Sequence, residues 1–305
     1  MADRPPSLWL LTALVVVILA VAGVGGGYLY LQNHRAPAPG PKTVAVGDNV
    51  TVDYIGMFGS GPEQGRVFDT SVLSVAKNNL TWPKSLEYTP RGNKSAYVPL
   101  GVYIGPHAPK SGYSRDNVTF GQVVTGFWRG LIGLPGNQTF RITIPPLEGY
   151  GRTNASCLVT APLAVQVPVV VSIASGSFAT DYPNVTKSVG TEFTDPTYGW
   201  TDLILSTNAT SVSIENLPTV GFTATPAGWE IEVTAVAAGE ITVLNDIAPS
   251  QAGLLLGHSK STVCSQKQFI VSSVDPGLGT FTENFNREVV GQTLVFVVTV
   301  DAIYP

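Results

Sequence analysis

The stretch that most constrains the fold is residues 121–151, which reads as a strand, one short apolar helix and a second strand. Phe127, Leu131 and Leu134 recur at helical spacing, and a Gly-Leu-Pro-Gly sequence ends the helix. Residues 139–144 then alternate between polar and apolar side chains, as a half-buried strand does. A single short helix between strands predicts a small sheet wrapped around that helix.

The composition favours a β-rich protein and argues against several classes of partner. The chain has 305 residues, 44% apolar and 12% charged, so it can bury a sizeable core and is long enough for two domains. Its 32 glycines and 23 prolines favour many short strands joined by turns. A net charge of -4 without a basic cluster argues against nucleic acid as a partner. Three histidines and two cysteines, none at ligand spacing, predict no built-in metal site and no cofactor.

The apolar segment at residues 7–31 is long enough to cross a membrane. It carries no charge, and at about 1.5 Å per residue it can span a hydrocarbon core of about 30 Å. Trp9 lies near one end and Tyr28 and Tyr30 near the other, as in an interfacial aromatic belt. The alternative is a cleaved signal peptide, because residues 20–22 (AVA) form a small-residue cleavage site. We expect a retained transmembrane anchor, since the apolar run continues past that site.

Sequons and cysteines indicate that the remaining chain lies outside the cytoplasm. Residues 33–42 form a Pro-rich spacer, so residues 1–42 are expected to be the anchor and its linker. Eight Asn-x-Ser/Thr sequences beyond the anchor predict an exposed glycoprotein surface: Asn49, Asn79, Asn93, Asn117, Asn137, Asn154, Asn184 and Asn208. Cys157 and Cys264 are expected to form a disulfide in such a compartment, with two unrelated buried thiols as the alternative.

Two short strands precede the helix in the sequence. Val50, Val52 and Tyr54 alternate with polar residues, which predicts a half-buried strand. After a Gly-rich turn, residues 66–71 form a second extended piece. Asp69 in this piece follows a large aromatic residue, and it is either a turn cap or the acceptor of a pocket.

Five motifs follow one another along the chain: VGDNVTVDYIG (46–56), GRVFDTS (65–71), QVVTGFWRGLIGL (122–134), TFRITIPPLEGYG (139–151) and VGQTLVFVVTVDAI (290–303). In this ordered set the chain resembles the FKBP-type peptidyl-prolyl cis-trans isomerases. The insertion between the fourth and fifth motifs is similar to that of the SlyD-like, insert-in-flap branch found in archaea and bacteria. The resemblance implies an α+β, mainly β fold, with an antiparallel half-barrel around one short helix. Residues 43–151 would form its first part, residues 152–284 an inserted β-rich, chaperone-like domain, and residues 285–305 the closing strand.

The chemistry implied by this resemblance needs neither a nucleophile nor a metal. Rotation about an X-Pro bond has a barrier near 20 kcal/mol, and an apolar cup that favours the twisted amide lowers it. Carried over by motif, Tyr54, Phe68 and Asp69 would line one side of the cup. Val123 and Val124 would form the rim, with the Val124 N–H as a donor, and Phe127 would be the floor. Tyr150 would reach in from the flap with its hydroxyl, and Phe296 would close the wall. The alternative for each aromatic residue is an ordinary place in the core.

Two features depart from the family pattern. Phe127 stands where many members carry Trp, and Trp128 follows it. The loop at residues 72–119 is far longer than usual and could shade the cup. A further aromatic residue of the pocket would come from residues 100–105 or from residues 117–121, and the sequence leaves both open.

The insertion shows no long helical pattern and is predicted to be an all-β module. Residues 159–173 are strongly apolar and are interrupted by Pro162 and Pro168, so they read as two short strands. Further strands are predicted at residues 200–205, 211–214, 229–236, 240–244 and 267–271. A bond between Cys157 and Cys264 would tie the two ends of this module together. The apolar stretch at 158–173 suggests a surface for unfolded chains, although such strands more often form a module's own core.

Taken together, the sequence predicts a membrane-anchored, extracytoplasmic prolyl isomerase with a chaperone-like insert. Its partners would be proline-containing unfolded or nascent polypeptides, and its N-terminal helix would hold it at the cell membrane. Two alternatives keep the half-barrel without catalysis: a cell-surface binding protein, and a holdase that binds clients without isomerising them.

Overall fold

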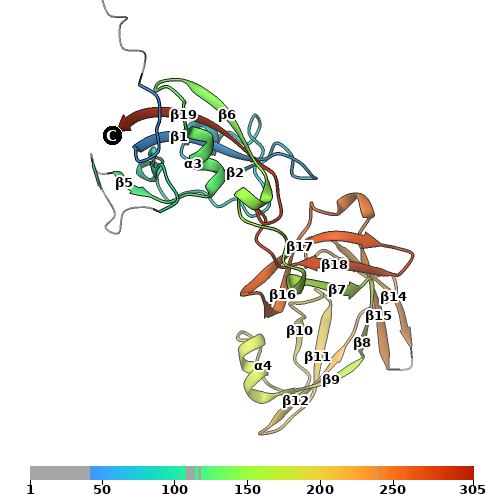
Figure 1. The fold of residues 1–305 in the computed structure, drawn as a ribbon. Helices are drawn as coiled ribbons and strands as arrows, with labels where there is room; N and C mark the ends of the chain where they lie inside the picture. Colours follow the sequence, from blue (N-terminus) through green and yellow to red (C-terminus); the bar gives the residue numbers. More distant parts are fainter. Residues whose placement is uncertain (1–41, 108–113, 116–117, 238) are drawn as a thin grey trace, which may run out of the picture. The chain divides into compact units, whose positions relative to one another are not determined.

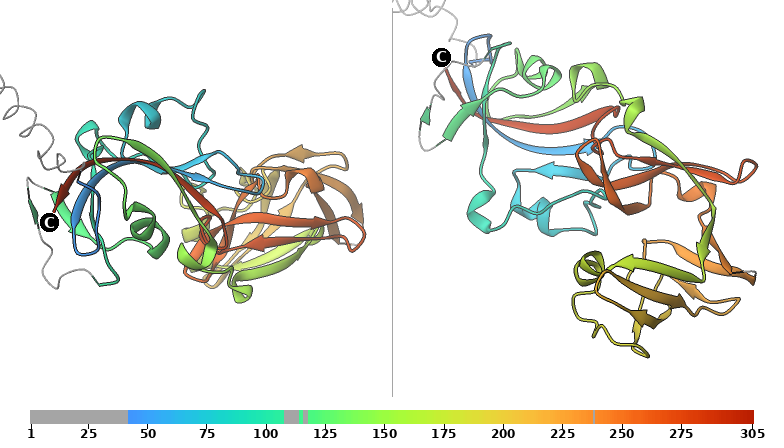
Figure 2. Two further views of the ribbon diagram at one scale, coloured as in Figure 1. Left: turned by 45° about the horizontal axis from the view of Figure 1, so that its top comes forward. Right: turned by 90° about the horizontal axis from the view of Figure 1, so that it is seen from below.

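The computed structural model describes residues 42–107, 114–115, 118–237 and 239–305. One mostly antiparallel sheet of seven strands has the order β4-β5-β3-β1-β19-β6, with β2 paired to β1; β3 and β5 are parallel. Its strands are β1 (Asn49–Phe58), β2 (Val67–Thr70), β3 (Leu100–Tyr103), β4 (Ser114–Arg115), β5 (Val118–Gly121), β6 (Thr139–Ile144) and β19 (Leu294–Tyr304). Strands β1 and β19 pair along their whole length inside the sheet, and in Figure 2 the blue and the dark red strand run side by side. The first and last described strands of the chain are therefore neighbours in the sheet.

The helix α3 (Thr125–Leu131) lies against this curved sheet, as Figure 1 shows. Its side chains Phe127, Trp128 and Leu131 are buried in a core shared with β1, β6 and β19. The structure confirms the predicted mainly β fold. Gly126 and Gly130, one helical turn apart, face β6. A Cβ at Gly126 would lie 2.5 Å from Ile144 Cγ2, and one at Gly130 would collide with Ile142, so the two glycines let the helix approach the strand.

We expect Gly130→Ala to lower the free energy of unfolding by about 1–3 kcal/mol, because the added methyl group overpacks the contact with Ile142. Chemical denaturation measures the change. Gly176→Ala is the matched control, since Gly176 lies in the helix α4 (Ser175–Asp181) with nothing near its missing Cβ. That control should be neutral or stabilising. Equal effects of the two substitutions would contradict the close-contact explanation.

The residues between β6 and β19 form three four-stranded antiparallel sheets. Each sheet joins three consecutive strands to one strand of the apolar run at 158–174. The sheets are β10-β11-β12-β9, β13-β14-β15-β8 and β16-β17-β18-β7. The bounds are β7 (Leu158–Pro162), β8 (Ala164–Pro168), β9 (Val170–Ala174), β10 (Glu192–Thr194), β11 (Thr201–Thr207), β12 (Ser211–Asn216), β13 (Thr223–Ala224), β14 (Glu230–Ala237), β15 (Glu240–Asp246), β16 (Leu256–Val263), β17 (Gln266–Asp275) and β18 (Thr280–Asn284).

These three sheets are nested copies of one arrangement. The sheet that contains β9 is inserted between β8 and β13, and the sheet that contains β8 is inserted between β7 and β16. The same backbone contact recurs every six residues along the apolar run. The carbonyls of Cys157, Leu163 and Val169 accept from the N–H groups of Phe285, Asn245 and Asn216, respectively. The insert is therefore built from three units, a property that the sequence analysis did not predict.

The prediction of two strands within residues 159–173 is wrong, because the run contains the three strands β7, β8 and β9. Pro162 and Pro168 each end a strand, and each strand pairs with a different sheet. Their side chains alternate between exposed and half-buried positions. Val159, Ala161 and Val167 pack against the core of the insert, so half of this apolar run is used inside the module.

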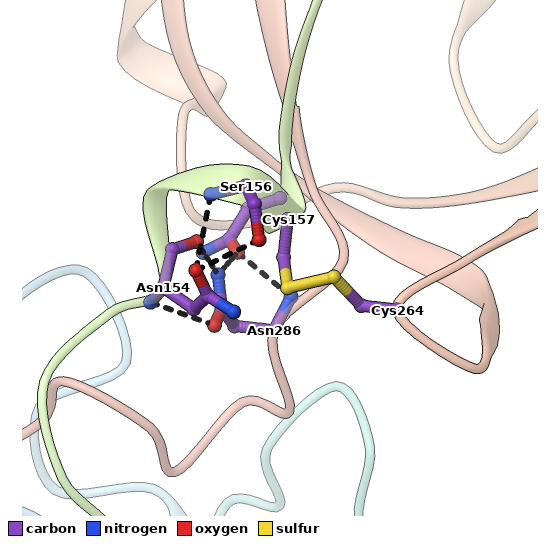
Figure 3. Close-up of a disulfide and its surroundings, with 6 residues drawn as sticks. Asn154, Ser156, Cys157, Cys264 and Asn286 are labelled. Atoms are coloured by element: carbon purple, nitrogen blue, oxygen red, sulfur yellow. Dashed lines mark hydrogen bonds between the residues drawn. A yellow bond between two sulfur atoms is a disulfide. The ribbon is translucent and has the colours of Figure 1, made fainter.

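A disulfide joins Cys157, just before β7, to Cys264 in the turn between β16 and β17 (Figure 3). Beside it, the Asn286 side chain accepts from the Asn154 N–H at 3.0 Å and donates to the Asn154 carbonyl at 3.1 Å. The Gly291 N–H also donates to the Gly151 carbonyl at 2.9 Å. The chain therefore leaves the seven-stranded sheet and returns to it through neighbouring segments.

The remaining helical elements are short. The loop between β2 and β3 contains α2 (Leu73–Lys77) and the 3-10 turn η1 (Lys94–Ala96). Other 3-10 turns are η2 (Pro146–Glu148), η3 (Ala155–Cys157) and η4 (Pro249–Gln251). The predicted transmembrane anchor at residues 7–31 lies outside the described residues. In the part of the chain that the structure describes, no helix has the length and apolarity needed to cross a membrane.

Candidate functional site

A cavity of about 540 Å³ opens beside α3, between the start of the helix and the sheet. The eight residues that the sequence analysis assigned to a cup all line it, together with Leu100 and Gln122. The full lining is Tyr54, Phe68, Asp69, Leu100, Gln122, Val123, Val124, Phe127, Tyr150 and Phe296. The structure thus gathers side chains from β1, β2, α3, β19 and the segment after η2 around one space.

Aromatic rings make up most of the wall of the cavity. The Phe296 ring lies edge-on to Phe127 with centroids 4.8 Å apart, and edge-on to Phe68 at 5.6 Å. Tyr54 packs against the same group, 6.1 Å from Phe296. Gly56 on β1 leaves room for two of these rings, since a Cβ there would lie 2.7 Å from Phe68 and 2.9 Å from Phe296. The glycine is therefore needed for the wall to close.

A polar group occupies one edge of this aromatic wall. The Tyr54 hydroxyl donates to Asp69, and Arg91 donates to the Tyr54 oxygen at 2.7 Å and to Asp69 at 3.2 Å. Burial, followed by the Asp69 carboxylate, raises the pKa of the Tyr54 hydroxyl above its usual range. Tyr54 therefore keeps its proton at physiological pH, and Asp69 acts as an acceptor in the cavity edge.

Arg91 is a site residue that the sequence analysis missed. It lies in the long loop at 72–119, and its guanidinium also lies 5.8 Å from the centre of the Tyr97 ring. This loop is fixed from a distant part of the chain, because the Glu288 carboxylate accepts from the Ser85 hydroxyl at 2.7 Å and from the Leu86 N–H at 2.9 Å. No local sequence pattern marks Arg91, so only the path of the loop reveals it.

We expect Arg91→Met to weaken any ligand that uses this cavity by about three- to tenfold, because Asp69 and Tyr54 lose a donor that orients them. Titration of a proline-containing peptide against both proteins measures the change. Lys94→Met serves as the matched control, because Lys94 lies in the same loop but makes no hydrogen bond to Tyr54 or Asp69. An equal loss for both variants would show that the loop matters only as a whole.

The rim of the cavity offers an unused backbone donor. Val124 precedes α3, and its carbonyl accepts the N–H groups of Phe127 and Trp128, which begins the helix. The Val124 N–H itself has no acceptor among the described residues. Val123 and Val124 pack at the edge of the core, half-buried. The rim can therefore donate one hydrogen bond to a carbonyl group that enters the cavity.

Tyr150 lines the cavity from the segment that follows η2, and it is 40% exposed. The described residues provide no hydrogen-bond partner for its hydroxyl, and burial of the ring raises its pKa. The Arg287 guanidinium lies 5.7 Å from the centre of the ring. The side chain is therefore held at the mouth of the cavity with a protonated, unengaged hydroxyl.

The sequence predicted one more aromatic residue in the pocket, from residues 100–105 or from residues 117–121. Among the described residues, neither range contributes an aromatic side chain to the lining. Leu100 on β3 takes that place, while Phe120 on β5 packs against Tyr304 with ring centroids 5.6 Å apart. Leu100 is also the only described residue of the 72–119 loop that lines the cavity. The described parts of the loop thus leave the cavity open, with an aliphatic wall on this side.

The chain is similar to two curated peptidyl-prolyl cis-trans isomerases. It is 31% identical over 116 residues to a short-type peptidyl-prolyl cis-trans isomerase of Methanocaldococcus jannaschii, a match that covers 38% of this chain and 56% of the relative. It is 27% identical over 181 residues to the human peptidyl-prolyl cis-trans isomerase FKBP10, covering 55% of this chain and 24% of that protein. The chain thus spans little more than half of the first relative and about a quarter of the second. No protein-family model matches it.

Proposed function

We propose that this protein is a peptidyl-prolyl cis-trans isomerase built on an FKBP-type half-barrel. The observation that carries the proposal is the cavity of about 540 Å³, in which five aromatic side chains surround a space edged by one carboxylate and one free N–H. Similarity to two named isomerases supports the same class of activity. The SlyD-like branch, with its insert in the flap, is part of the proposal.

The proposed mechanism depends on the contrast between an apolar space and a few polar groups. A proline ring enters among Phe127, Phe296 and Phe68, where water is excluded. The planar amide loses the solvation that favours it, so the barrier near 20 kcal/mol falls. The Val124 N–H donates to a substrate carbonyl and holds the peptide while the bond turns. The Tyr150 hydroxyl donates from the mouth of the cavity to the twisted amide.

A prolyl-peptide isomerisation assay on residues 43–305 tests this activity. Catalysis above the rate in buffer is expected, on protein shown to be folded by circular dichroism. A folded protein that leaves the rate unchanged would overturn the enzyme and favour a binding protein on the same half-barrel. Peptide binding to the cavity without catalysis would identify that binding protein.

The insert is proposed to hold unfolded client chains near the cavity. Several large apolar side chains of the insert are exposed, and this supports the proposal: Leu158, Val170, Val189, Leu205, Leu217, Val220, Val236 and Leu278. A client bound there would present its prolines at a raised effective concentration. Removing residues 153–284 tests the role, because the Gly291 N–H donates to the Gly151 carbonyl, so the remaining ends lie on neighbouring segments that a short turn can join. Unchanged activity on an unfolded protein, as opposed to a short peptide, would reject the chaperone role.

The N-terminal segment is proposed to anchor the protein in the cell membrane, with the folded part outside the cytoplasm. The disulfide supports this placement, since such bonds persist in oxidising compartments. Protease added to intact cells should remove the folded part from the anchored protein. Complete protection in cells that remain sealed, with degradation after lysis, would place the protein inside.

A further inference from the structure

One sheet of the insert differs from its two sister sheets at a single buried position. In each sheet the second strand (β11, β14 or β17) pairs with the third through a register shift. The last residue of the second strand that is paired before the shift is Ile204, Val233 or Val271, respectively. Two residues before these stand Asp202, Ile231 and Phe269, which are 1%, 3% and 3% exposed. The position therefore takes an apolar side chain in two units of the same fold and a carboxyl group in the third. The arrangement of the strands does not require an aspartate there.

The hydrogen bonds around Asp202 do not explain its presence either. Its Oδ1 accepts from Trp200 Nε1 at 3.0 Å, but that donor also reaches Asn216 Oδ1 at 3.3 Å. In the second sheet Trp229 Nε1 donates to Asn245 at 2.9 Å, and no carboxyl group is present. The tryptophan N–H is thus satisfied without an aspartate.

No N–H group of the described residues donates to the second oxygen of Asp202, and its other hydrogen-bond partner is the carboxyl group of Asp195. A hydrogen bond between two carboxyl groups requires a proton that the pair shares. Burial, together with the Asp195 carboxylate, raises the pKa of Asp202 to about 7. Two carboxyl groups buried side by side are costly for a fold unless a proton or a cation lies between them.

Both carboxyl groups line a cavity of about 160 Å³ that has aromatic and aliphatic walls. The Tyr182 hydroxyl donates to Asp195 at 3.4 Å, and the Tyr198 ring lies flat on Trp200 with centroids 4.3 Å apart. The rest of the lining is Val167, Val171, Ile173, Thr197, Ile214 and Asn216. The space is therefore acidic at one end and apolar along its sides.

The charges that act on this cavity are all negative. Burial and then the carboxylates of Asp195, Asp202 and Asp181 raise the pKa of the Tyr182 hydroxyl. Burial and Asp195 likewise raise the pKa of Tyr198. Lys187, the cationic residue that follows α4, is bound to the Ser175 hydroxyl and the Asn208 carbonyl instead. No cation of the described chain neutralises the pair, so a cation from outside would be stabilised there.

We propose that this cavity binds an alkylammonium group, of the kind carried by a lysine side chain. The ammonium would donate to Asp202 Oδ2 and to Asp195, displacing the proton that the pair otherwise retains. The tyrosine rings offer π faces to the cation, and the valines and isoleucines fit its methylene chain. A hard divalent cation requires six or more oxygen ligands, which these apolar walls do not supply. This proposal is independent of the isomerase activity.

Calorimetric titration of the full chain with Nα-acetyl-lysine amide at pH 7.5 tests the proposal. Its uncharged analogue Nα-acetyl-norleucine amide is the comparison ligand. We expect the lysine compound to bind at least about tenfold more tightly, since charge-assisted hydrogen bonds contribute that much. Asp202→Ile should abolish the preference, and it should fold because it copies Ile231 of the sister sheet. Asp202→Asn, which keeps the shape, should abolish it as well.

Three outcomes would overturn the proposal. They are equal affinity for both ligands, an unchanged preference in the Asp202 variants, and binding of calcium chloride that excludes the amine. Comparing n-butylamine with a lysine-containing peptide identifies the source of the ammonium group. Binding of both indicates a client side chain, whereas binding of butylamine alone indicates a free amine; either result supports the proposed chemistry.

Discussion

Replacing both Cys157 and Cys264 by alanine is expected to lower the free energy of unfolding of the insert by about 2–5 kcal/mol. The bond joins residues 107 positions apart, so it removes much of the conformational freedom of the unfolded insert. It also fixes the outermost of the three nested units, whose strands β7 and β16 enclose the other two. Denaturation followed by tryptophan fluorescence measures the effect, because Trp200 and Trp229 are both buried in the insert.

Ser156→Ala is the control for this substitution, since Ser156 neighbours the disulfide but is exposed. The cavity beside α3 contains no residue of the insert's three sheets, so turnover of a short prolyl peptide should remain unchanged in the double variant. A loss of stability below about 1 kcal/mol would mean that the three sheets hold the insert closed without the bond.

Asp69→Ala is expected to lower kcat/KM for a prolyl peptide by about tenfold or more. The carboxylate accepts from Tyr54 and Arg91 at the edge of the cavity; its removal leaves the Tyr54 hydroxyl without its acceptor and removes one of the acceptors of Arg91. Leaving such groups unsatisfied costs about 1–3 kcal/mol, which corresponds to roughly a 5- to 150-fold change. Steady-state kinetics on one peptide, with a thermal unfolding curve for each protein, measures this effect.

Asp275→Ala provides the comparison, because Asp275 accepts from the Leu278 N–H in a hairpin of the insert, away from the cavity. It should retain full turnover. Undiminished turnover in Asp69→Ala, with normal stability, would exclude Asp69 from the working site. A large loss of stability in that variant would instead show that the three-residue group supports the fold.

The eight cup residues could be placed because the motifs that carry them resemble those of a known family, and local patterns indicate the direction of some of their side chains. Phe127 follows from helical spacing after Val124, and Tyr54 follows from strand alternation in β1. Phe296 belongs to the last strand, which the resemblance placed in the wall of the cup; its pairing with β1 is seen only in the structure. Local patterns of this kind survive folding, because a helix or strand determines which side of it a residue faces.

Arg91 and Leu100 could not be placed in the same way. The loop that carries them is positioned by hydrogen bonds from Glu288, about two hundred residues further along the chain. Neither residue belongs to a periodic element that would indicate its direction. Contacts at such a separation depend on how the whole chain closes, and a local pattern contains no information about them.

The sequence contains a signal of the three-unit insert. Pro162 and Pro168 are six residues apart, and a Gly-Trp pair occurs at residues 199–200 and again at 228–229. The proline spacing equals the interval of six residues at which equivalent backbone contacts recur along the apolar run, and each Gly-Trp pair directly precedes the second strand of a sheet. The apolar run alone suggested two strands. Periodicity within a short apolar run does not show how many strands it contains when each strand pairs with a distant part of the chain.

The sequence by itself determined the β-rich character and the short helix that carries Phe127 and Leu131, because side-chain spacing within one element is local. The residues that surround the cavity followed from the resemblance of the motifs to a known family. Only the tertiary structure decided that β7, β8 and β9 join three different sheets, that Arg91 meets Asp69, and that Asp202 lies buried beside Asp195. These depend on contacts between distant segments, whose free energy is gained only when the chain closes around them.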